Sequence, residues 1–106
     1  MFSDERINQI LSVGRSLSDD GVNNWALTRE QALQTVDSFA EGGFSISGGD
    51  VYVANQGKLE SNYDNWYCER NSSEGDQEFS ERSLNKAKEY ISSYGLSDAL
   101  FVIVPG

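Results

Sequence analysis

The spacing of apolar residues changes abruptly near Phe44, and this change constrains the fold more than any other feature of the sequence. Before Phe44, apolar residues recur every three or four positions, which is typical of amphipathic helices. From Phe44 to Ala54, apolar and polar residues largely alternate, which is typical of a strand with one buried face. The pattern therefore predicts helices and a sheet, combined in one domain that spans residues 1–106.

The first predicted helix spans residues 4–17, and its apolar stripe consists of Ile7, Ile10, Leu11, Gly14 and Leu17. Asp19-Asp20-Gly21 is expected to end it, because these residue types favour turns. Residues 21–26 are then expected to form a loop, in which Trp25 is the best candidate for an exposed aromatic residue.

The second predicted helix begins at Thr28, which is a suitable N-cap residue. Gln31 follows three positions later and can complete a capping box. Gly42-Gly43 is expected to end the helix. Its predicted buried stripe consists of Ala32, Leu33, Val36, Phe39 and Ala40.

Gly48-Gly49 interrupts the alternating segment, which suggests a bulge or a tight connection between two strand pieces. In such a turn, the carboxylate of Asp50 would accept hydrogen bonds from backbone amides. We therefore expect Gly49→Val to cost roughly 1–3 kcal/mol, through a backbone conformation that a β-branched residue cannot adopt.

Asn55-Gln56-Gly57 predicts a hairpin turn into a strand at residues 58–62. A further strand is predicted over residues 65–70. Trp66 and Cys68 would share its buried face, and Tyr67 would lie on the other.

Residues 71–77 contain no apolar side chain and predict a loop. A third helix follows, closed by Gly95, with Phe79 at its beginning and a buried face made by Leu84, Ala87, Ile91 and Tyr94. Residues 99–104 are apolar without interruption, which predicts a strand in the middle of the sheet. The order helix, helix, strands, helix, strand predicts an α+β fold with a mainly antiparallel sheet covered by helices.

The sequence offers few residues for catalysis. It contains no histidine and a single cysteine, Cys68, so histidine-dependent catalysis and a cysteine zinc site are both excluded. No phosphate-binding loop is present, and we expect no cofactor and no bound metal. A pair of carboxylates, Asp50 with Asp64 or Glu69, is the remaining catalytic possibility, and it is the weakest interpretation of the chain.

Seventeen acidic and eight basic residues give a net charge of −9. Such a charge repels nucleic acid and anionic membranes and favours a basic partner, although it can also serve solubility alone. The beginning of the chain lacks the features of a signal peptide, so a cytoplasmic location is expected. The acidic residues cluster at two places, Asp19-Asp20 and the set Glu69, Glu74, Asp76, Glu78 and Glu81.

Several segments together resemble the immunity protein 40 family of bacterial polymorphic toxin systems. They include Gly48-Gly49-Asp50-Val51-Tyr52, Asp64-Asn65-Trp66-Tyr67, Arg82-Ser83 and Phe101-Val102-Ile103-Val104, within a resemblance that covers roughly residues 27–104. The resemblance implies a non-enzymatic protein, often encoded in contact-dependent inhibition loci, that binds and blocks the C-terminal domain of a cognate toxin. Such toxins are frequently nucleases with basic grooves.

For the toxin contacts, Glu74, Asp76 and Glu78 are the first candidates, because the segment over residues 69–81 combines several acids with a predicted loop. We expect their joint replacement by alanine to leave the fold intact and to weaken binding at least about tenfold. The remaining candidates are Glu69, Glu81, Asp19 and Asp20. The family motif residues Gly48, Gly49, Asp50, Trp66 and Tyr67 are expected to be mainly architectural, with Trp66 in the core. Tyr67 fits a core residue and an interface anchor about equally, and a direct contact role is the lesser alternative for Asp50.

Two other binding functions fit the composition. A secretion chaperone would be a dimer with an exposed apolar groove, whereas an immunity protein is expected to act as a monomer. An acidic DNA mimic would carry its carboxylates in rows along the surface.

Overall fold

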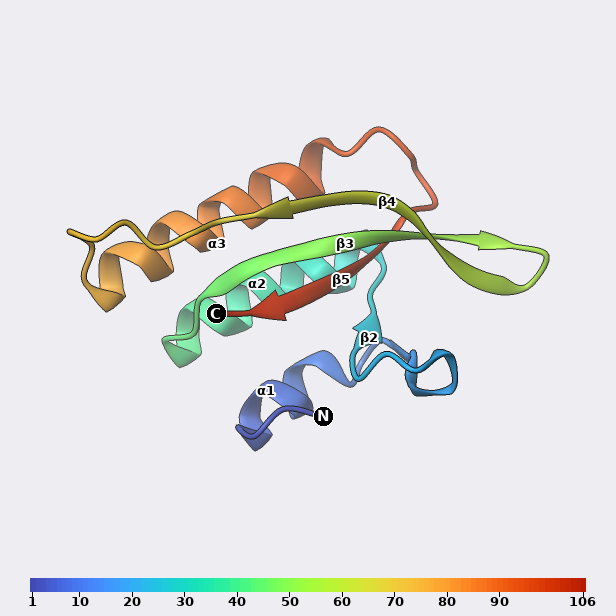
Figure 1. Cartoon of the computed structure of the whole chain (residues 1–106), viewed down its shortest axis with the longest axis horizontal. Helices are drawn as coiled ribbons and strands as arrows, with labels where there is room; N and C mark the ends of the chain where they lie inside the picture. Colours follow the sequence, from blue (N-terminus) through green and yellow to red (C-terminus); the bar gives the residue numbers. More distant parts are fainter.

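Two long helices cover one face of a three-stranded antiparallel sheet in the computed structural model, which describes all residues 1–106 (Figure 1). The strand order is β4-β3-β5, and a short antiparallel pair, β1 and β2, forms a second sheet. The predicted α+β fold is confirmed. In chain order the elements are α1 (Glu5–Leu11), β1 (Arg15–Ser16), the 3₁₀ helix η1 (Ser18–Asp20), β2 (Trp25–Ala26), α2 (Arg29–Gly42), β3 (Ile46–Asn55), β4 (Lys58–Tyr67), α3 (Asp76–Ser93) and β5 (Leu100–Pro105).

Helix α2 has the boundaries that its sequence predicts. The Thr28 N–H donates to Gln31 Oε1 (3.0 Å) and the Gln31 N–H donates to Thr28 Oγ1 (3.1 Å), so the capping box is present. At the other end, Gly43 adopts a φ of 76°, the left-handed conformation that commonly closes helices. Ala40, which the sequence placed on the buried stripe, is exposed.

Helix α1 is shorter than predicted, because it ends at Leu11. Gly14 lies directly against β2, where a Cβ would be only 2.5 Å from the carbonyl oxygen of Ala26. The chain leaves the helix before this contact with β2. The expected loop over residues 21–26 contains β2, which pairs with β1. Trp25 is half-buried and packs against the main core, so its predicted exposure is wrong.

Strand β3 passes through Gly48-Gly49 without a turn. The pairing register shifts between Ile46 and Gly48 on the β5 side and between Asp50 and Tyr52 on the β4 side, so the expected irregularity consists of bulges. Asp50 is an exposed residue within the strand. The interpretation of Asp50 as a turn residue is therefore wrong.

A two-residue turn joins β3 to β4, as predicted. Gln56 and Gly57 have φ values of 53° and 81°, and positive φ at both positions is what a type I′ hairpin turn requires. The two strands predicted over residues 58–62 and 65–70 are one strand, β4, which ends at Tyr67. Within β4, residues 62–64 form a bulge opposite Val51 alone.

Strand β5 lies next to β3 at one side of the sheet, so its predicted central position is wrong. Its free side is closed by a single bridge, in which Leu27 and Phe101 exchange backbone hydrogen bonds of 2.8 and 2.7 Å. The Asn24 side chain also donates to the Ile103 carbonyl oxygen (2.8 Å). Residues 99–104 are apolar without interruption because both faces of β5 are covered.

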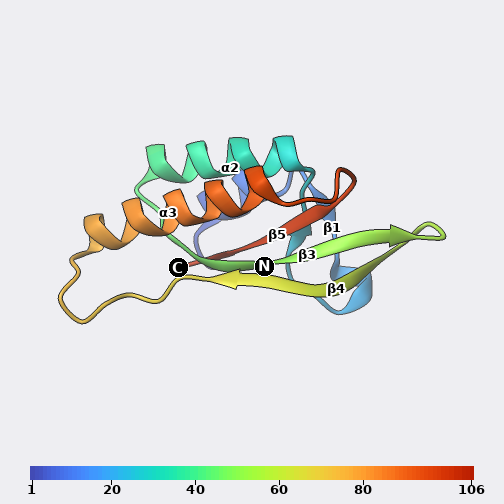
Figure 2. The ribbon, with the colours of Figure 1, turned by 90° about the horizontal axis from the view of Figure 1, so that it is seen from above.

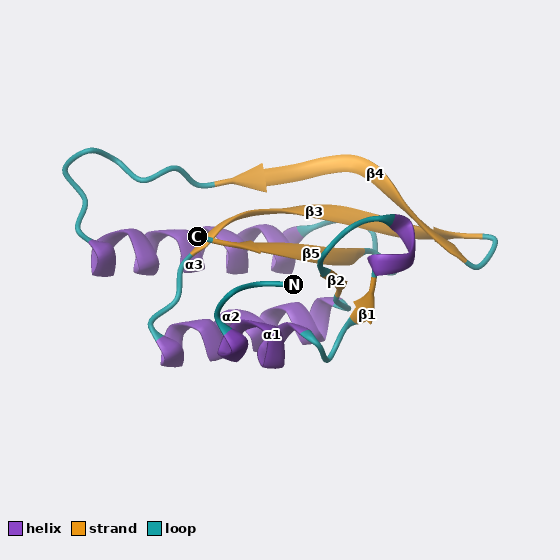
Figure 3. Ribbon diagram, turned by 60° about the horizontal axis from the view of Figure 1, so that its bottom comes forward, coloured by secondary structure: helices purple, strands orange, loops and turns teal.

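The two faces of the sheet are covered unequally. Figure 2 shows α2 and α3 on one side of the strands and the segment around η1 on the other. On that second side, Leu17 and Ala26 pack on Val102 to form a small core of their own, whereas the main core lies under the helices. Residues 15–26 therefore cover only part of this second side, which we call the outer face (Figure 3).

Helix α3 begins at Asp76, so the last two residues of the loop predicted over residues 71–77 are helical. Phe79 is buried in its first turn, as expected, and so are Leu84, Ala87 and Ile91 of its predicted apolar face. The helix does not end on a left-handed glycine. It ends through Tyr94 in an extended conformation, and Gly95 lacks a positive φ.

Candidate functional site

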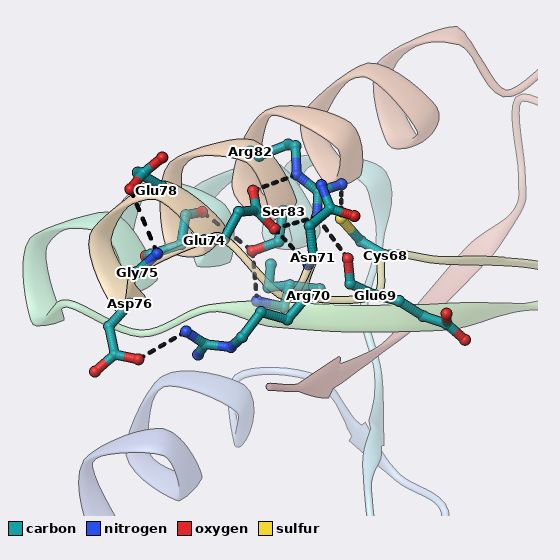
Figure 4. A network of polar contacts seen from close by, with 12 residues as sticks. Cys68, Glu69, Arg70, Asn71, Glu74, Gly75, Asp76, Glu78, Arg82 and Ser83 are labelled. Carbon is teal, nitrogen blue, oxygen red and sulfur yellow. Dashed lines mark hydrogen bonds and ion pairs between the residues drawn. The ribbon is translucent and has the colours of Figure 1, made fainter.

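Glu74, the first of the predicted toxin contacts, lies in an internal ion pair. Arg82 of α3 donates from Nε to Oε2 and from Nη2 to Oε1 of Glu74, both at 2.6 Å, and the Asn71 N–H donates to Oε1 (2.8 Å) (Figure 4). The side chain of Glu74 is only 10% exposed. The hydrogen bonds from Arg82 and then from Asn71 lower the pKa of Glu74 to about 2.

Arg82 connects the same loop to α3 through further contacts. Its Nη2 also donates to the Glu69 carbonyl oxygen, and its Nη1 donates to the Cys68 sulfur atom (3.1 Å). The partnership with Glu74 raises the pKa of Arg82. Arg82 thus holds residues 68–74 against the helix, and Glu74 serves to position this loop rather than to meet solvent.

The other predicted contacts on this side are exposed. Asp76 and Glu78 stand in the first turn of α3, Glu81 lies one turn further on, and Glu69 is in the preceding loop. Asp76 pairs with Arg70 (2.7 Å), but its side chain is almost fully accessible. Glu78 and Glu81 line a shallow, open hollow on α3 together with Asn85, Lys86 and Glu89, and no apolar residue takes part in it. Glu78 and Glu81 therefore belong to one polar face of the helix, whereas Asp76 points to a different side and Glu69 lies outside the helix.

Asp19 and Asp20 belong to a different surface. They lie in η1, at the opposite end of the molecule from the beginning of α3 (Figure 1). Asp20 and Asp50 both face Tyr52, whose pKa is raised first by burial and then by these two charges. The structure therefore separates the two acidic clusters.

The family motif residues divide into two groups. Gly48, Gly49 and Trp66 are buried, and the Trp66 ring stacks on Tyr90 of α3 at 4.7 Å. Asp50 and Tyr67 are exposed, and 66% of the Tyr67 surface is accessible. The first group holds strands and helix together, whereas the second is available to a partner.

Tyr67 borders a shallow hollow on the outer face of the sheet. In the pairing register, Tyr67 and Val104 lie on either side of Gly48, and Asn65 lies beside Asp50. These residues line the hollow together with Ser47, Gly49 and Trp66. Gly48 faces the same side as its partners Tyr67 and Val104, so its lack of a side chain leaves this part of the outer face open.

Tyr63 is a prominent surface residue that the sequence reasoning missed. It is 86% exposed, and its φ of 69° places it in the left-handed region, which non-glycine residues rarely adopt. It lies at the centre of the β4 bulge. The signal in the sequence was the polar flank on each side, Asn62 and Asp64-Asn65, which breaks the alternation of a regular strand.

Two structural criteria bear on other functions. No group of three histidine, cysteine or carboxylate side chains lies close enough together to hold a metal ion. No helix has both the length and the apolar character needed to span a bilayer.

Residues 16–105 match the family model described as Immunity protein 40. The chain belongs to the immunity protein 40 family. The match begins in β1 and ends in β5, so it includes every strand together with α2 and α3, and it extends further toward the N-terminus than the resemblance seen in the sequence. Membership means that the chain is a non-enzymatic inhibitor that neutralises a cognate toxin. No curated protein and no solved structure gives a significant match.

Proposed function

We propose that this immunity protein acts in the cytoplasm as a monomer and binds the C-terminal domain of a toxin encoded beside it. We propose further that the toxin is a nuclease, whose basic groove attracts the acidic chain. The observation that carries this proposal is the excess of unpaired carboxylates, since seventeen acidic residues take part in only three ion pairs. Complementary charge of this kind accelerates encounter and discriminates between partners.

The exposed acids on α3 are the proposed rim of the toxin interface. Glu78 and Glu81 lie on one polar face, Asp76 is exposed in the first turn, and Glu69 is in the loop that precedes the helix. Glu74 contributes indirectly, because its bond to Arg82 holds the loop that carries Glu69. The acids of η1, Asp19 and Asp20, are a second and separate candidate surface.

The two sides of the sheet support a monomer. Regular exposed edges invite pairing with a second copy of a chain, and bulges or covering segments prevent it. The β4 side is interrupted by the bulge at residues 62–64, and the β5 side is bridged by Leu27. A sizing column checks this, because a secretion chaperone would elute as a dimer.

Co-expression with the adjacent toxin tests the function directly. We expect survival with the cognate toxin and death with an unrelated toxin of the same class. Equal killing with and without this protein would refute neutralisation.

Charge steering has its own test in binding kinetics. The association rate should fall as salt rises from about 0.05 to 0.5 M, because ions screen exposed charges. The triple variant Asp76→Asn, Glu78→Gln and Glu81→Gln should weaken binding at least about tenfold, or about 1.4 kcal/mol, mainly through slower association.

The matched control carries Glu30→Gln, Asp37→Asn and Glu41→Gln, which remove the same charge from exposed positions on α2. Binding of the control should stay within about threefold of the parent, or about 0.7 kcal/mol. Equal effects of the two triple variants would mean that only the net charge of the protein matters for binding. An association rate that does not change with salt would mean that the acidic residues serve solubility only.

A further inference from the structure

Tyr63 has an unfavourable backbone conformation, and its side chain makes little contact that would stabilise the fold. A φ of 69° is sterically unfavourable for a residue with a Cβ, and its 86% exposure means that the ring buries almost no surface. Strained residues of this kind persist where the surrounding structure holds them, and they concentrate at functional sites. Packing within the molecule therefore does not explain why the ring is held at the surface.

Contacts within the bulge hold Tyr63 in place. The Tyr63 N–H donates to Ser61 Oγ (3.1 Å), and the Asp64 N–H donates to Asn62 Oδ1 (3.0 Å). The Asn65 side chain donates to the Tyr63 carbonyl oxygen (3.1 Å). The backbone on both sides of the tyrosine is thus defined by local hydrogen bonds.

Helix α3 anchors the same bulge from the side. Asn62 Nδ2 donates to Tyr94 Oη (2.8 Å), and the Tyr94 hydroxyl donates to the Asp64 carboxylate. The Tyr94 ring packs edge-on against Phe101 of the core, with 5.8 Å between centroids. A segment fixed in this way loses little conformational entropy on binding, so ordering it reduces the binding free energy only slightly.

Tyr67 is a second exposed ring on the same strand, and it borders the hollow of the outer face. The Lys86 ammonium lies 5.5 Å from its centroid and helps to orient it. Tyrosine is among the residue types that dominate the energetics of protein interfaces. Strand β4 therefore presents two large aromatic groups to solvent.

The charges around the two rings are mainly acidic. Asp64 and Glu60 lie on β4, Asp50 lies on β3 beside it, and Glu69 follows the strand. None of these four carboxylates takes part in an ion pair. Aromatic anchors within an acidic rim complement a basic protein surface that contains an apolar recess.

We propose that β4 is the docking strand of the toxin interface, with Tyr63 as its principal anchor and Tyr67 as the second. The inference rests on the proposed function, since it needs a basic toxin domain as the occupant. Lys86 of α3 contacts Tyr67, the last residue of β4, and Tyr94, the C-cap of α3, contacts the bulge in the middle of the strand. The acids of the helix therefore form the rim of the same interface. The anchors then govern dissociation, and the rim governs association.

Tyr63→Gly separates a structural role from a binding role. If Tyr63 serves the fold, the substitution should lower the melting temperature; if it serves binding, the substitution should weaken toxin affinity and leave the fold as stable as before. Glycine adopts a positive φ without strain, so the melting temperature should stay the same or rise. Binding to the inactivated C-terminal domain of the adjacent toxin should weaken at least about tenfold through faster dissociation. Tyr63→Asn, which also tolerates this conformation, should behave in the same way, and Tyr63→Phe should stay within about threefold of the parent.

Leu96→Ala is the control, since it truncates an exposed apolar side chain outside β4 and should leave affinity unchanged. The unmodified protein is measured first, and if it does not bind the toxin domain, the proposed function fails. If it binds and Tyr63→Gly binds equally well, only the inference is overturned. A fall of more than about 5 °C in the melting temperature of Tyr63→Gly, on the order of 1 kcal/mol, would assign the tyrosine to the fold and likewise overturn it.

Discussion

Replacing Gly49 by alanine should destabilise the protein, because the added methyl group has no space. A Cβ at this position would lie 2.2 Å from Cη2 of Trp66 and 2.5 Å from the Val102 carbonyl oxygen. The sequence predicted harm from Gly49→Val through backbone conformation, but Gly49 lacks a positive φ. The physical reason is instead the close approach of β3 to the Trp66 ring and to β5.

The size of the effect follows from these distances. Comfortable contact between carbon atoms requires about 3.5–4.0 Å, so the ring must retreat by more than about 1 Å. Overpacking of this kind costs about 1–3 kcal/mol. Complete expulsion of Trp66, which is 5% exposed, would set a ceiling of about 5 kcal/mol for about 200 Å² of aromatic surface. We expect a loss of about 2–4 kcal/mol for Gly49→Ala and more for Gly49→Val.

Thermal unfolding followed by tryptophan fluorescence measures this loss. The midpoint should fall by about 8–30 °C, given about 4–8 °C per kcal/mol for a domain of this size. Gly95→Ala is the matched control, because nothing lies within 4 Å of its added methyl group and its φ is not positive. Combining Gly49→Ala with Trp66→Leu should cost less than the sum of the single changes. A Gly49→Ala midpoint within about 2 °C of the control would refute the steric argument.

Two further predictions concern the surroundings of α3. The folded pKa of Glu74 is about 2 and its ordinary value is 4.5, so the unfolded chain takes up the proton first and stability falls as pH drops through this interval. Urea unfolding between about pH 6 and 2 should therefore show a shallower acid loss for Glu74→Gln than for the parent or Glu81→Gln, and identical slopes would exclude the Arg82 pair as the cause. Ser83→Ala should cost about 1–3 kcal/mol, because the buried Ser83 hydroxyl accepts a hydrogen bond from the Ile46 N–H (3.1 Å), which would lose its partner. Chemical denaturation measures this cost, and an unchanged midpoint would mean that the amide finds another acceptor.

The structure also changes the meaning of the triple replacement of Glu74, Asp76 and Glu78 that the sequence suggests. Glu74 holds the loop to Arg82, whereas Asp76 and Glu78 are exposed. A triple alanine variant would therefore combine a structural loss with a surface change. Replacing Asp76, Glu78 and Glu81 instead leaves the Glu74–Arg82 pair in place.

Several features could be predicted from the sequence because their causes are local. The capping box of Thr28 and Gln31, the closure of α2 at Gly43 and the turn at Gln56-Gly57 each depend on residues within a few positions of one another. The change of apolar spacing near Phe44 likewise marked the passage from helix α2 to strand β3. The lack of histidine excludes histidine-dependent catalysis whatever the fold, because no arrangement of the chain can supply the missing imidazole.

Only the tertiary structure decided the features that depend on distant segments. Leu27 closes the free side of β5, so an apolar strand can lie beside β3 and still be buried. Arg82 takes Glu74 away from the surface, although both residues are charged and charged side chains usually meet solvent. The network from Asn62 through Tyr94 to Asp64 holds the bulge that exposes Tyr63. Residue type sets what each side chain can bind, but which partner it meets depends on contacts between segments that only the folded chain brings together.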